Sequence, residues 1–369
     1  MLKVVQVVSD TNIGGAGRYL LNYLKYFDRE RFKVTVIVPE KSALIEFIAK
    51  HNDVELIEAP YMADKSYDKN CVKFLKGVFK NIKPDILHTH ASLSARIAGR
   101  KAKIPCIVAT RHCIEPKASK IKAAAMGFLN NLLCDYYIAV ADAVAQNLYE
   151  GGIKPEKVKV IYNGVEAAAT HPIEELLLER ATLGIKDHEF VFSIFARLEK
   201  VKGHRYFLKA ARELKKAGYH AKFLIVGDGS LRDELEDKAK SYGIADDVIF
   251  TGYVKDTSLL LGASDVNVIS SESEAMSLAI LEAMSLGKPT IATLTGGNPE
   301  IVKNGVNGYL TGVGDSASLA DAMIKIMENE PHYIELSENA YRNYTEKFKA
   351  EFMVENIERF YEEVTKNVY

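Results

Sequence analysis

The 369-residue chain contains no run of 18 or more apolar residues, so the sequence predicts no transmembrane helix. Its amino terminus, MLKVVQVVSD, lacks the basic segment, apolar segment and small-residue cleavage site of a secretory leader. Cysteine is scarce, and no short paired spacing is present, which favours structural thiols in a reducing compartment. The cysteines are Cys71, Cys106, Cys113 and Cys134. We therefore expect a cytoplasmic protein.

The sequence also lacks a basic low-complexity arm and any recognisable nucleic-acid-binding motif, so nucleic acid is not an expected partner. The net charge of −1 conceals an asymmetry between the two halves of the chain. Residues 1–165 carry 25 Lys and Arg against 16 Asp and Glu, a balance of +9, whereas residues 166–369 carry 23 against 33, a balance of −10. We expect the basic first half to meet something anionic.

Short apolar segments alternate with amphipathic helical stretches along the whole chain, which predicts βαβ units and parallel sheets. The first set of expected strands spans 2–8, 33–38, 54–58, 85–88, 105–109, 135–140 and 157–161. After a linker from Asn163 to Pro172, a second set spans 190–196, 221–226, 247–250, 266–270 and 289–293. Helices are expected at 203–217, at 230–241 and throughout the chain after about 316. The pattern predicts two facing, doubly wound α/β domains that bind ligands beyond the carboxyl ends of their strands.

A glycine-rich segment, Gly14-Gly15-Ala16-Gly17, directly follows the first expected strand. Glycine allows backbone N–H groups to approach a ligand closely, and the following helix offers a positive amino terminus. The segment is neither a complete G-x-G-x-x-G motif, because Leu20 occupies the third glycine position, nor a Walker A motif. An ordinary tight turn and an anion-facing loop both remain open.

Two cations, Arg197 and Lys202, lie on the loop that follows the first strand of the second half. Both can reach a diphosphate and stabilise the charge that develops on a leaving group. The alternative is a solvated basic loop. A second turn, Gly227-Asp228-Gly229-Ser230, is expected to be structural, with Ser230 as a helix N-cap.

The most informative segment contains two carboxylates, Glu274 and Glu282, around the start of an apolar helix that follows a strand. A carboxylate can accept hydrogen bonds from vicinal sugar hydroxyls, and the helix amino terminus favours phosphate. The alternative is one acidic residue near a helix start and one solvent-facing Glu. The next strand leads into Thr295-Gly296-Gly297-Asn298-Pro299-Glu300, which is either a ligand-facing turn or a plain β-to-α turn.

Three histidines, His88, His90 and His112, follow strands of the first half, but their spacing matches no zinc motif, and we predict no metal site. His112, in Thr110-Arg111-His112, lies where a strand opens, and it either hydrogen-bonds a substrate hydroxyl or is an ordinary loop imidazole. The chain contains no Asp-x-Asp pair for a metal–diphosphate clamp. Arg197 and Lys202 would have to replace such a clamp.

Taken together, these motifs resemble those of the family-4 glycosyltransferases, which have the GT-B fold. The E-x7-E element corresponds to Glu274 and Glu282, and R-x4-K-G corresponds to Arg197 and Lys202-Gly203. The G-G-x-x-E element corresponds to Gly296-Gly297 and Glu300, and N-G-V to Asn163-Gly164-Val165. The resemblance covers nearly the whole chain and is densest from about 190 to 310.

The resemblance implies a retaining, metal-independent enzyme without a required cofactor. It would move a hexosyl or N-acetylhexosaminyl group from a UDP- or GDP-sugar to an acceptor hydroxyl. The acceptor would be a glycan, a lipid-linked sugar or a small molecule, in cell-surface glycan or glycolipid synthesis. The implied domains are an acceptor-side domain (1–165), a nucleotide-sugar domain (166–348) and a terminal helix (349–369) that returns to the first domain.

The resemblance also implies roles for individual residues. Arg197 and Lys202 would hold the diphosphate, Glu282 the ribose and Glu274 a sugar hydroxyl. Gly15 would approach the phosphate. The acceptor side would include Gly14, Gly15, Arg111 and His112, with His112 contacting the transferred sugar. Relatives often have Gly-Phe-Gly after the first Glu, whereas this chain has Ala275, Met276 and Ser277 before Leu278. Ala141 also replaces a frequent Ser. These departures leave the donor sugar open.

Two other classes fit a similar scaffold: a sugar-nucleotide epimerase, and a non-catalytic nucleotide-sugar-binding partner. A phosphorylase would need a pyridoxal lysine or a phosphate pocket, and the sequence shows neither. Basic residues also accompany the apolar helical stretch 121–133, and they are Arg96, Arg100, Lys101, Lys103, Lys117, Lys120 and Lys122. This combination suits peripheral contact with an anionic membrane or a lipid-linked acceptor, and the alternative is a solvated basic face.

Overall fold

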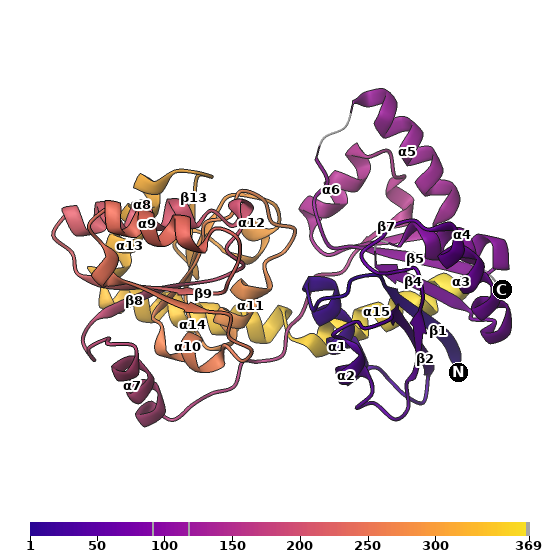
Figure 1. Cartoon of the computed structure of the whole chain (residues 1–369), viewed down its shortest axis with the longest axis horizontal. Helices are drawn as coiled ribbons and strands as arrows, with labels where there is room; N and C mark the ends of the chain where they lie inside the picture. The colour runs from indigo at the N-terminus through magenta and orange to yellow at the C-terminus, as the bar shows by residue number, and fades with distance from the viewer. Residues whose placement is uncertain (91, 117–118, 367–369) are drawn as a thin grey trace. The chain divides into compact units, whose positions relative to one another are not determined.

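The computed structural model describes residues 1–90, 92–116 and 119–366. The chain divides into two compact units. The first comprises Met1–Val165 together with the terminal segment that begins at Ala350, and the second comprises Glu166–Lys349. Each unit has its own parallel sheet covered by helices (Figure 1). None of the helices in the described ranges is long and apolar enough to cross a lipid bilayer.

The first unit contains a seven-stranded sheet in the order β3-β2-β1-β4-β5-β6-β7. Its strands are β1 (Leu2–Val8), β2 (Phe32–Pro39), β3 (Glu55–Ala59), β4 (Ile86–His90), β5 (Cys106–Arg111), β6 (Tyr136–Ala139) and β7 (Val158–Val160). Its helices are α1 (Gly15–Tyr26), α2 (Ile45–Ile48), α3 (Lys69–Ile82), α4 (Leu93–Ala102), α5 (Lys120–Leu133), α6 (Asp142–Glu150) and α15 (Ala350–Lys366). The strand order reverses between β1 and β4, which places the ends of these two strands at the switch point of the sheet.

The run of valines in β1 explains its central place in the sheet. Val4, Val5, Val7 and Val8 are all buried, as expected for a parallel strand covered by helices on both faces. Gln6 interrupts this apolar run and is also fully buried. A buried amide needs hydrogen-bond partners, so this position is not explained by packing alone.

The terminal helix α15 completes the core of the first unit, beside α1 (Figure 1). Its apolar face, including Ile357 and Tyr361, belongs to the same cluster as β1 and β2. Burial of each such side chain contributes about 1.5–3 kcal/mol. A segment that lies about 300 residues away in sequence is therefore needed to close this core.

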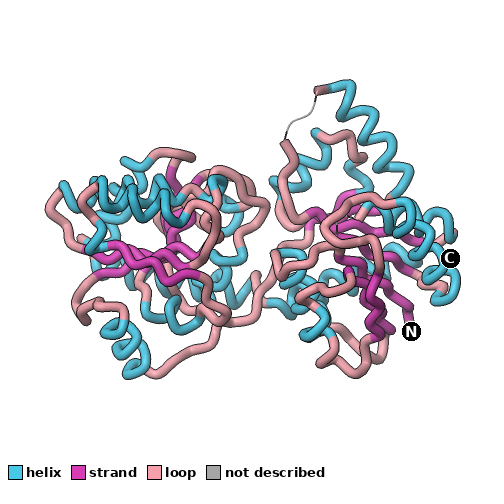
Figure 2. The backbone as a smooth tube through the Cα atoms, viewed as in Figure 1, coloured by secondary structure: helices cyan, strands magenta, loops and turns pink. Residues whose placement is uncertain are grey.

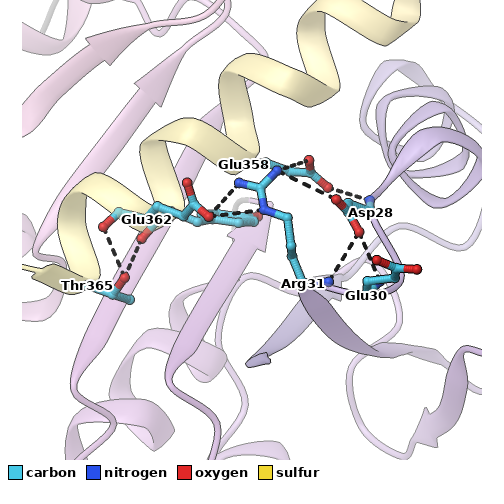
Figure 3. A network of polar contacts seen from close by, with 7 residues as sticks. Asp28, Glu30, Arg31, Glu358, Glu362 and Thr365 are labelled. Carbon is cyan, nitrogen blue, oxygen red and sulfur yellow. Dashed lines mark hydrogen bonds and ion pairs between the residues drawn. The ribbon is translucent and has the colours of Figure 1, made fainter.

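A polar network fastens the other side of α15 to the loop before β2 (Figure 3). Arg31 pairs with Glu362 at 2.5 Å and with Glu358 at 3.6 Å. Glu358 also accepts a 2.6 Å hydrogen bond from the Asp28 amide. Burial raises the pKa of Glu358, so its ion pair with Arg31 and the amide bond offset a real desolvation cost.

The second unit contains a six-stranded parallel sheet in the order β10-β9-β8-β11-β12-β13. Its strands lie between layers of helices (Figure 2). Its strands are β8 (Phe190–Phe195), β9 (Ala221–Val226), β10 (Val248–Gly252), β11 (Val266–Ile269), β12 (Thr290–Thr293) and β13 (Gly308–Thr311). Its helices are α7 (Ile173–Thr182), α8 (His204–Lys216), α9 (Arg232–Ser241), α10 (Ser258–Ala263), α11 (Leu278–Ser285), α12 (Asn298–Ile301), α13 (Ser316–Met327) and α14 (Glu330–Lys347). The order reverses between β8 and β11.

The predicted strands agree with the observed ones to within a few residues. One strand was not predicted, and the start of one helix was predicted wrongly. The sequence did not predict β13, because Gly305 and Gly308 flank a short strand and resemble loop punctuation. The predicted N-cap at Ser230 is wrong. Helix α9 begins at Arg232, and its N-cap residue is Leu231, with no side-chain capping bond.

Candidate functional site

Three loops of the second unit follow β8, β11 and β12, which are neighbours in the sheet. The carboxyl ends of parallel strands share one edge, so these loops lie together next to the switch point between β8 and β11. These loops and the helices that follow them carry the residues of the R-x4-K-G, E-x7-E and G-G-x-x-E elements. The edge of the sheet thus gathers motifs that are up to about a hundred residues apart in sequence.

Gly203 allows the loop after β8 to pack tightly against the loop after β11. Its φ is 69°, and a Cβ at this position would overlap the carbonyl oxygen of Ser270. The Ser270 hydroxyl donates to the carbonyl oxygens of Lys202 and Gly203 at 3.2 and 3.0 Å. The Glu272 amide donates to the Val201 carbonyl at 2.7 Å. These bonds fix the position of one loop relative to the other.

The packing of these two loops brings Lys202 and Glu274 together. Lys202 Nζ lies 2.7 Å from Glu274 Oε1, which also accepts a 2.7 Å hydrogen bond from the Ser271 hydroxyl. The two side chains are only 23% and 11% exposed, so the pair is partly shielded from water. An ammonium group carries three N–H donors, so this pair is compatible with a further bond from Lys202 to an anionic oxygen.

Arg197 lies apart from that pair. Its side chain is 74% exposed and forms a 2.7 Å ion pair with Glu199. An exposed pair of this kind contributes at most about 1 kcal/mol, so Arg197 can exchange its partner at little cost. The structure therefore brings together Lys202 and Glu274, but it does not place Arg197 in contact with either.

The second carboxylate, Glu282, is the fifth residue of α11 and is half-buried. Ala275, Met276 and Ser277 form the buried approach to this helix, followed by Leu278 at its first position. The first N–H groups of a helix have no partner within the helix and carry partial positive charge. The start of α11 is therefore suited to an anionic ligand.

The loop after β12 supports that approach. The Gly297 amide donates to the Ala275 carbonyl at 2.9 Å, and the Thr295 hydroxyl donates to the Glu272 carbonyl at 3.3 Å. Asn298 is fully buried, and its amide donates to the Thr293 carbonyl at 3.0 Å. This segment has a clear structural role. Pro299 is the second residue of α12.

In the first unit, Gly14 and Gly15 form the start of α1, directly after β1. Both are exposed, and a Cβ at either position would meet nothing within 4 Å. At Gly17, by contrast, a Cβ would lie 3.1 Å from Leu44. Packing within the unit therefore explains a small residue at 17 but does not explain glycine at 14 or 15.

His112 follows β5 and lies beside α1 and the end of β4. Its Nε2 is 2.8 Å from Nδ1 of His90, and its ring makes an edge contact with Tyr19 at 5.1 Å between centroids. Burial, reinforced by the nearby Arg111 charge, lowers the pKa of His112 to about 3. The imidazole is therefore neutral at pH 7 and carries one N–H.

Arg111 forms an ion pair with Glu115 across the loop that follows β5. The Glu115 amide donates to Asn147 Oδ1, and Asn147 Nδ2 donates to the Glu115 carbonyl, both at 2.9 Å. These bonds tie the loop to α6. Through its ion pair with Glu115, Arg111 is held to this loop.

Two family profiles match the chain in sequence. The profile described as Glycosyltransferase Family 4 matches residues 13–169, and the profile described as Glycosyl transferases group 1 matches residues 178–343. The chain belongs to the family-4 glycosyltransferases. Together the two matches include all the site residues discussed above.

Characterised relatives cover most of the chain. It is 28% identical to the UDP-Gal:alpha-D-GlcNAc-diphosphoundecaprenol alpha-1,3-galactosyltransferase of Escherichia coli, over 99% of this chain and 98% of the relative. It is 29% identical to the N-acetyl-alpha-D-glucosaminyl L-malate synthase of Bacillus anthracis, over 77% of this chain and 76% of the relative.

Solved structures show the same fold. The Anabaena HepE protein, crystallised with UDP and glucose, superimposes with a TM-score of 0.85 at 24% identity, over 98% of this chain and 99% of that one. A glycosyltransferase from Rickettsia africae gives a TM-score of 0.86 at 22% identity, over 99% of both chains. The family-4 glycosyltransferase therefore has the GT-B architecture.

The sequence did not single out two polar residues of this glycosyltransferase, Ser271 and Gln6, and it pointed to His90 only as a zinc ligand that we rejected. Ser271 bonds Glu274, and Gln6 and His90 bond a row that ends at His112. Gln6 could have been found, because it interrupts a run of valines in a central strand. Within the described ranges, no group of three or more His, Cys, Asp or Glu side chains is placed to hold a metal ion.

Proposed function

We propose that this glycosyltransferase moves a hexosyl or N-acetylhexosaminyl group from a UDP-sugar to the hydroxyl of a glycan or lipid-linked acceptor, with retention of anomeric configuration. The observation that carries the proposal is the Lys202–Glu274 pair at the switch point of the second sheet. It combines a cation for the diphosphate with a carboxylate for a sugar hydroxyl. The names of the Escherichia coli relative and of the Anabaena neighbour support UDP over GDP.

The site residues take the following roles in the proposal. Lys202 holds the diphosphate, and Arg197 joins it by leaving Glu199. Glu282 accepts hydrogen bonds from the ribose, and the backbone from Ala275 to Leu278 lines the donor at the positive end of α11. Gly14 and Gly15 allow the α1 amino terminus to approach the phosphate, and His112 and Arg111 contribute to the sugar and acceptor side.

In the reaction, the bond between the anomeric carbon and the diphosphate oxygen breaks as the acceptor oxygen attacks from the same face. The acceptor proton passes to the leaving phosphate, so no protein nucleophile is required. Negative charge grows on the diphosphate in the transition state, and the cation of Lys202 stabilises that charge more strongly there than in the ground state. Glu274 gains a sugar hydroxyl as a donor when Lys202 turns to the phosphate.

The proposal includes independence from metal ions, because the two cations take the place of a metal–diphosphate clamp. Two measurements test the reaction type. The anomeric configuration of the product, read by proton NMR, should match that of the donor. Turnover should be unchanged by excess EDTA. An inverted product would contradict the retaining mechanism, and loss of activity restored by Mg²⁺ or Mn²⁺ would contradict metal independence.

The acceptor side includes a proposed contact with an anionic membrane through α5. Ile121, Phe128 and Leu132 are 87%, 75% and 61% exposed, and their spacing places them on one face of the helix. The helix is held through its other face, where Gly127 lies against the backbone of residues 151–152. An exposed apolar face beside basic residues suits the interfacial region of a bilayer.

The basic cluster expected near α5 divides into two kinds of residue. Arg100 bonds the Leu132 carbonyl and Asp135, and Arg96 bonds Asn130, so these two arginines fasten α4 to the end of α5. Exposed lysines remain at 101, 103 and 122. Lys117 and the side chain of Lys120 lie outside the described residues. The membrane proposal therefore rests on the apolar face and on these three lysines.

A further inference from the structure

A row of polar side chains crosses the core of the first unit beneath His112. All four of its core residues are at most 2% exposed: Gln6, His88, His90 and Thr110. Buried polar groups are costly unless they are hydrogen-bonded, and packing alone does not select them. Their placement between the sheet and α15 therefore calls for a role.

The first half of the row leads from His112 to the terminal helix. His112 Nε2 lies 2.8 Å from His90 Nδ1, and His90 Nε2 lies 3.0 Å from Gln6 Oε1. Gln6 Nε2 then donates to the hydroxyl of Tyr361 at 2.9 Å. Two strands, the loop after β5 and α15 thus contribute one residue each: β4 carries His90, β1 carries Gln6, and His112 directly follows β5.

The second half returns to the sheet. The Tyr361 hydroxyl lies 2.5 Å from His88 Nδ1, and His88 Nε2 lies 2.6 Å from the Thr110 hydroxyl. Burial lowers the pKa of His88 to about 3 and that of His90 well below its usual value. Each imidazole in the row is therefore neutral at pH 7, with one nitrogen donating and the other accepting.

The amide of Gln6 determines the direction of every hydrogen bond toward His112. Its Oε1 can only accept, so His90 must carry its proton on Nε2 and accept at Nδ1. His112 must then donate from Nε2, which leaves its Nδ1 without a proton. On the other side, Gln6 Nε2 donates to Tyr361, whose hydroxyl donates to His88.

The opposite direction of these hydrogen bonds would change the protonated nitrogen of His112. If the Gln6 amide were turned over, it would donate to His90, and His90 would donate to His112. The proton of His112 would then lie on Nδ1, and the same atom would change from a hydrogen-bond acceptor to a donor. A site that must accept from a sugar hydroxyl would lose that ability.

We propose that Gln6 and His90 are positioning residues that hold His112 in its Nε2–H tautomer, so that Nδ1 accepts a hydrogen bond from the transferred sugar. The inference rests on the role of His112 in the proposed function, and it extends that role to two residues of the buried core. The row also links His112 to Tyr361, so α15 contributes to the state of a site residue as well as to the core.

The test uses the full-length protein labelled with ¹⁵N in its histidines. Two-bond proton–nitrogen spectra distinguish the Nε2–H and Nδ1–H tautomers, and the spectrum of His112→Gln assigns the His112 signals. The wild type should show the Nε2–H form at His112. Gln6→Leu removes the acceptor for His90, so the spectrum should change to a mixture of tautomers, and kcat should fall about 10-fold with little change in the KM for the donor.

Matched variants separate positioning from general damage to the core. His90→Asn keeps an acceptor near the position of Nδ1 and should retain most of the activity, whereas His90→Leu should not. Thr110→Val removes a hydrogen bond at the far end of the row and should leave the His112 tautomer unchanged. Thermal unfolding by circular dichroism checks each fold, and Gln6→Met, which also removes the amide acceptor of His90, replaces Gln6→Leu should the latter fail to fold.

Two results would overturn the inference: an Nδ1–H tautomer in the wild type, or a His112 tautomer that is unchanged in Gln6→Leu. A changed tautomer with unchanged turnover would also overturn the positioning role. Failure of the proposed function would look different, because the wild type would then turn over no nucleotide-sugar while the tautomer spectra could still be recorded.

Discussion

At the scale of single residues, the proposed donor site depends on a few side chains whose placement is fixed by their neighbours. Lys202 is the clearest case. Gly203 and Ser270 hold its loop against the β11 loop, and the resulting ion pair with Glu274 is mostly shielded from water. A partly buried cation costs free energy of folding unless an opposite charge compensates it. Glu274 provides that charge for Lys202.

Replacing Lys202 should therefore damage catalysis more than binding. We expect Lys202→Ala to lower kcat about 100-fold, because removal of one preorganised charge or donor at the transition state costs roughly 3 kcal/mol. Lys200→Ala, in the same turn but exposed, should keep wild-type rates. Steady-state kinetics with a UDP-sugar would measure kcat for both variants. Equal rates for the two variants would contradict the role of Lys202.

The carboxylates should respond differently from each other. Glu274→Gln should reduce transfer while the protein keeps its fold, since the amide still accepts from Ser271 but loses the charge that pairs with Lys202. Glu282→Ala should mainly weaken donor binding. Titration calorimetry with UDP, together with turnover measurements, separates the two effects, and wild-type values for both variants would remove these residues from the site.

Gly15 offers a test in which stability and activity separate. A Cβ at Gly15 meets nothing within 4 Å, so Gly15→Ala should change the free energy of unfolding by less than about 1 kcal/mol. If the backbone approaches a phosphate, the same methyl group should raise the KM for the donor several-fold. Gly77→Ala, on α3 and equally unobstructed, is the control and should leave the kinetics unchanged. Loss of stability in Gly15→Ala would contradict this reasoning.

Sequence patterns were informative for the charged residues of the motifs and less so for their partners. Spacing alone singled out Arg197, Lys202, Glu274 and Glu282. It did not indicate that Lys202 would bond Glu274 across 72 residues, because that contact depends on the order of strands in the sheet. The sequence did not indicate the role of Gln6 either, because its hydrogen-bond partners come from β4 and α15.

At the scale of elements, α5 differs from the other helices of the first unit in the apolar residues that it exposes. Ile121, Phe128 and Leu132 lie on one face, while Gly127 and Asn131 hold the opposite side to residues 151–152. The periodicity of the sequence predicted this helix, but it could not show which of its faces is covered. The burial of each face became known only from the fold.

The membrane proposal can be tested on that helix. Phe128→Glu places a charge in the apolar face and should reduce co-flotation with vesicles of anionic phospholipid at physiological salt by about 10-fold, because burial of a Phe contributes roughly 1.5–3 kcal/mol. Leu178→Glu on α7, where Leu178 is 68% exposed, is the control and should float like the wild type. No flotation of the wild type, or equal flotation of all three, would contradict the proposal.

Short elements were the least predictable. Strand β13 has only four residues, and its neighbouring glycines and asparagines favour turns. It forms because β12 offers an unpaired edge, which is a tertiary condition that no local pattern records. The start of α9 was misplaced for a similar reason, since Gly229 and the Leu198 backbone fix the turn that precedes it.

At the scale of the whole molecule, acid should destabilise the first unit. The pKa of His88 is lowered to about 3, whereas an unfolded histidine has a pKa near 6.5. The unfolded chain therefore binds more protons between these values, and stability falls as the pH drops below 6.5. For His88 alone the loss between pH 6.5 and 5.5 is about 1 kcal/mol.

Urea denaturation at pH 7.5 and 5.5 measures this effect. His88→Asn should lower stability at both pH values but reduce the difference between them. His220→Gln, at an exposed position, should leave the difference unchanged. A wild-type midpoint that does not fall at pH 5.5 would show that the buried histidines do not titrate as expected.

The division into two parallel-sheet units and the GT-B class followed from the alternation of strands and helices and from four motifs in a fixed order. The identities of the donor and acceptor did not follow, because they depend on the shape of loops that carry departures such as Ala275-Met276-Ser277. At this scale the central claim is that the chain is a transferase for a nucleotide-sugar.

The most direct test of that claim is to incubate the protein, without acceptor, with UDP-glucose, UDP-galactose, UDP-N-acetylglucosamine and GDP-mannose, each with and without EDTA. We expect slow release of UDP from one UDP-sugar, at the same rate with the chelator, and loss of that release in Lys202→Ala. Absence of binding and turnover with all four donors would contradict the account, and conversion of the sugar without release of nucleotide would point to an epimerase instead.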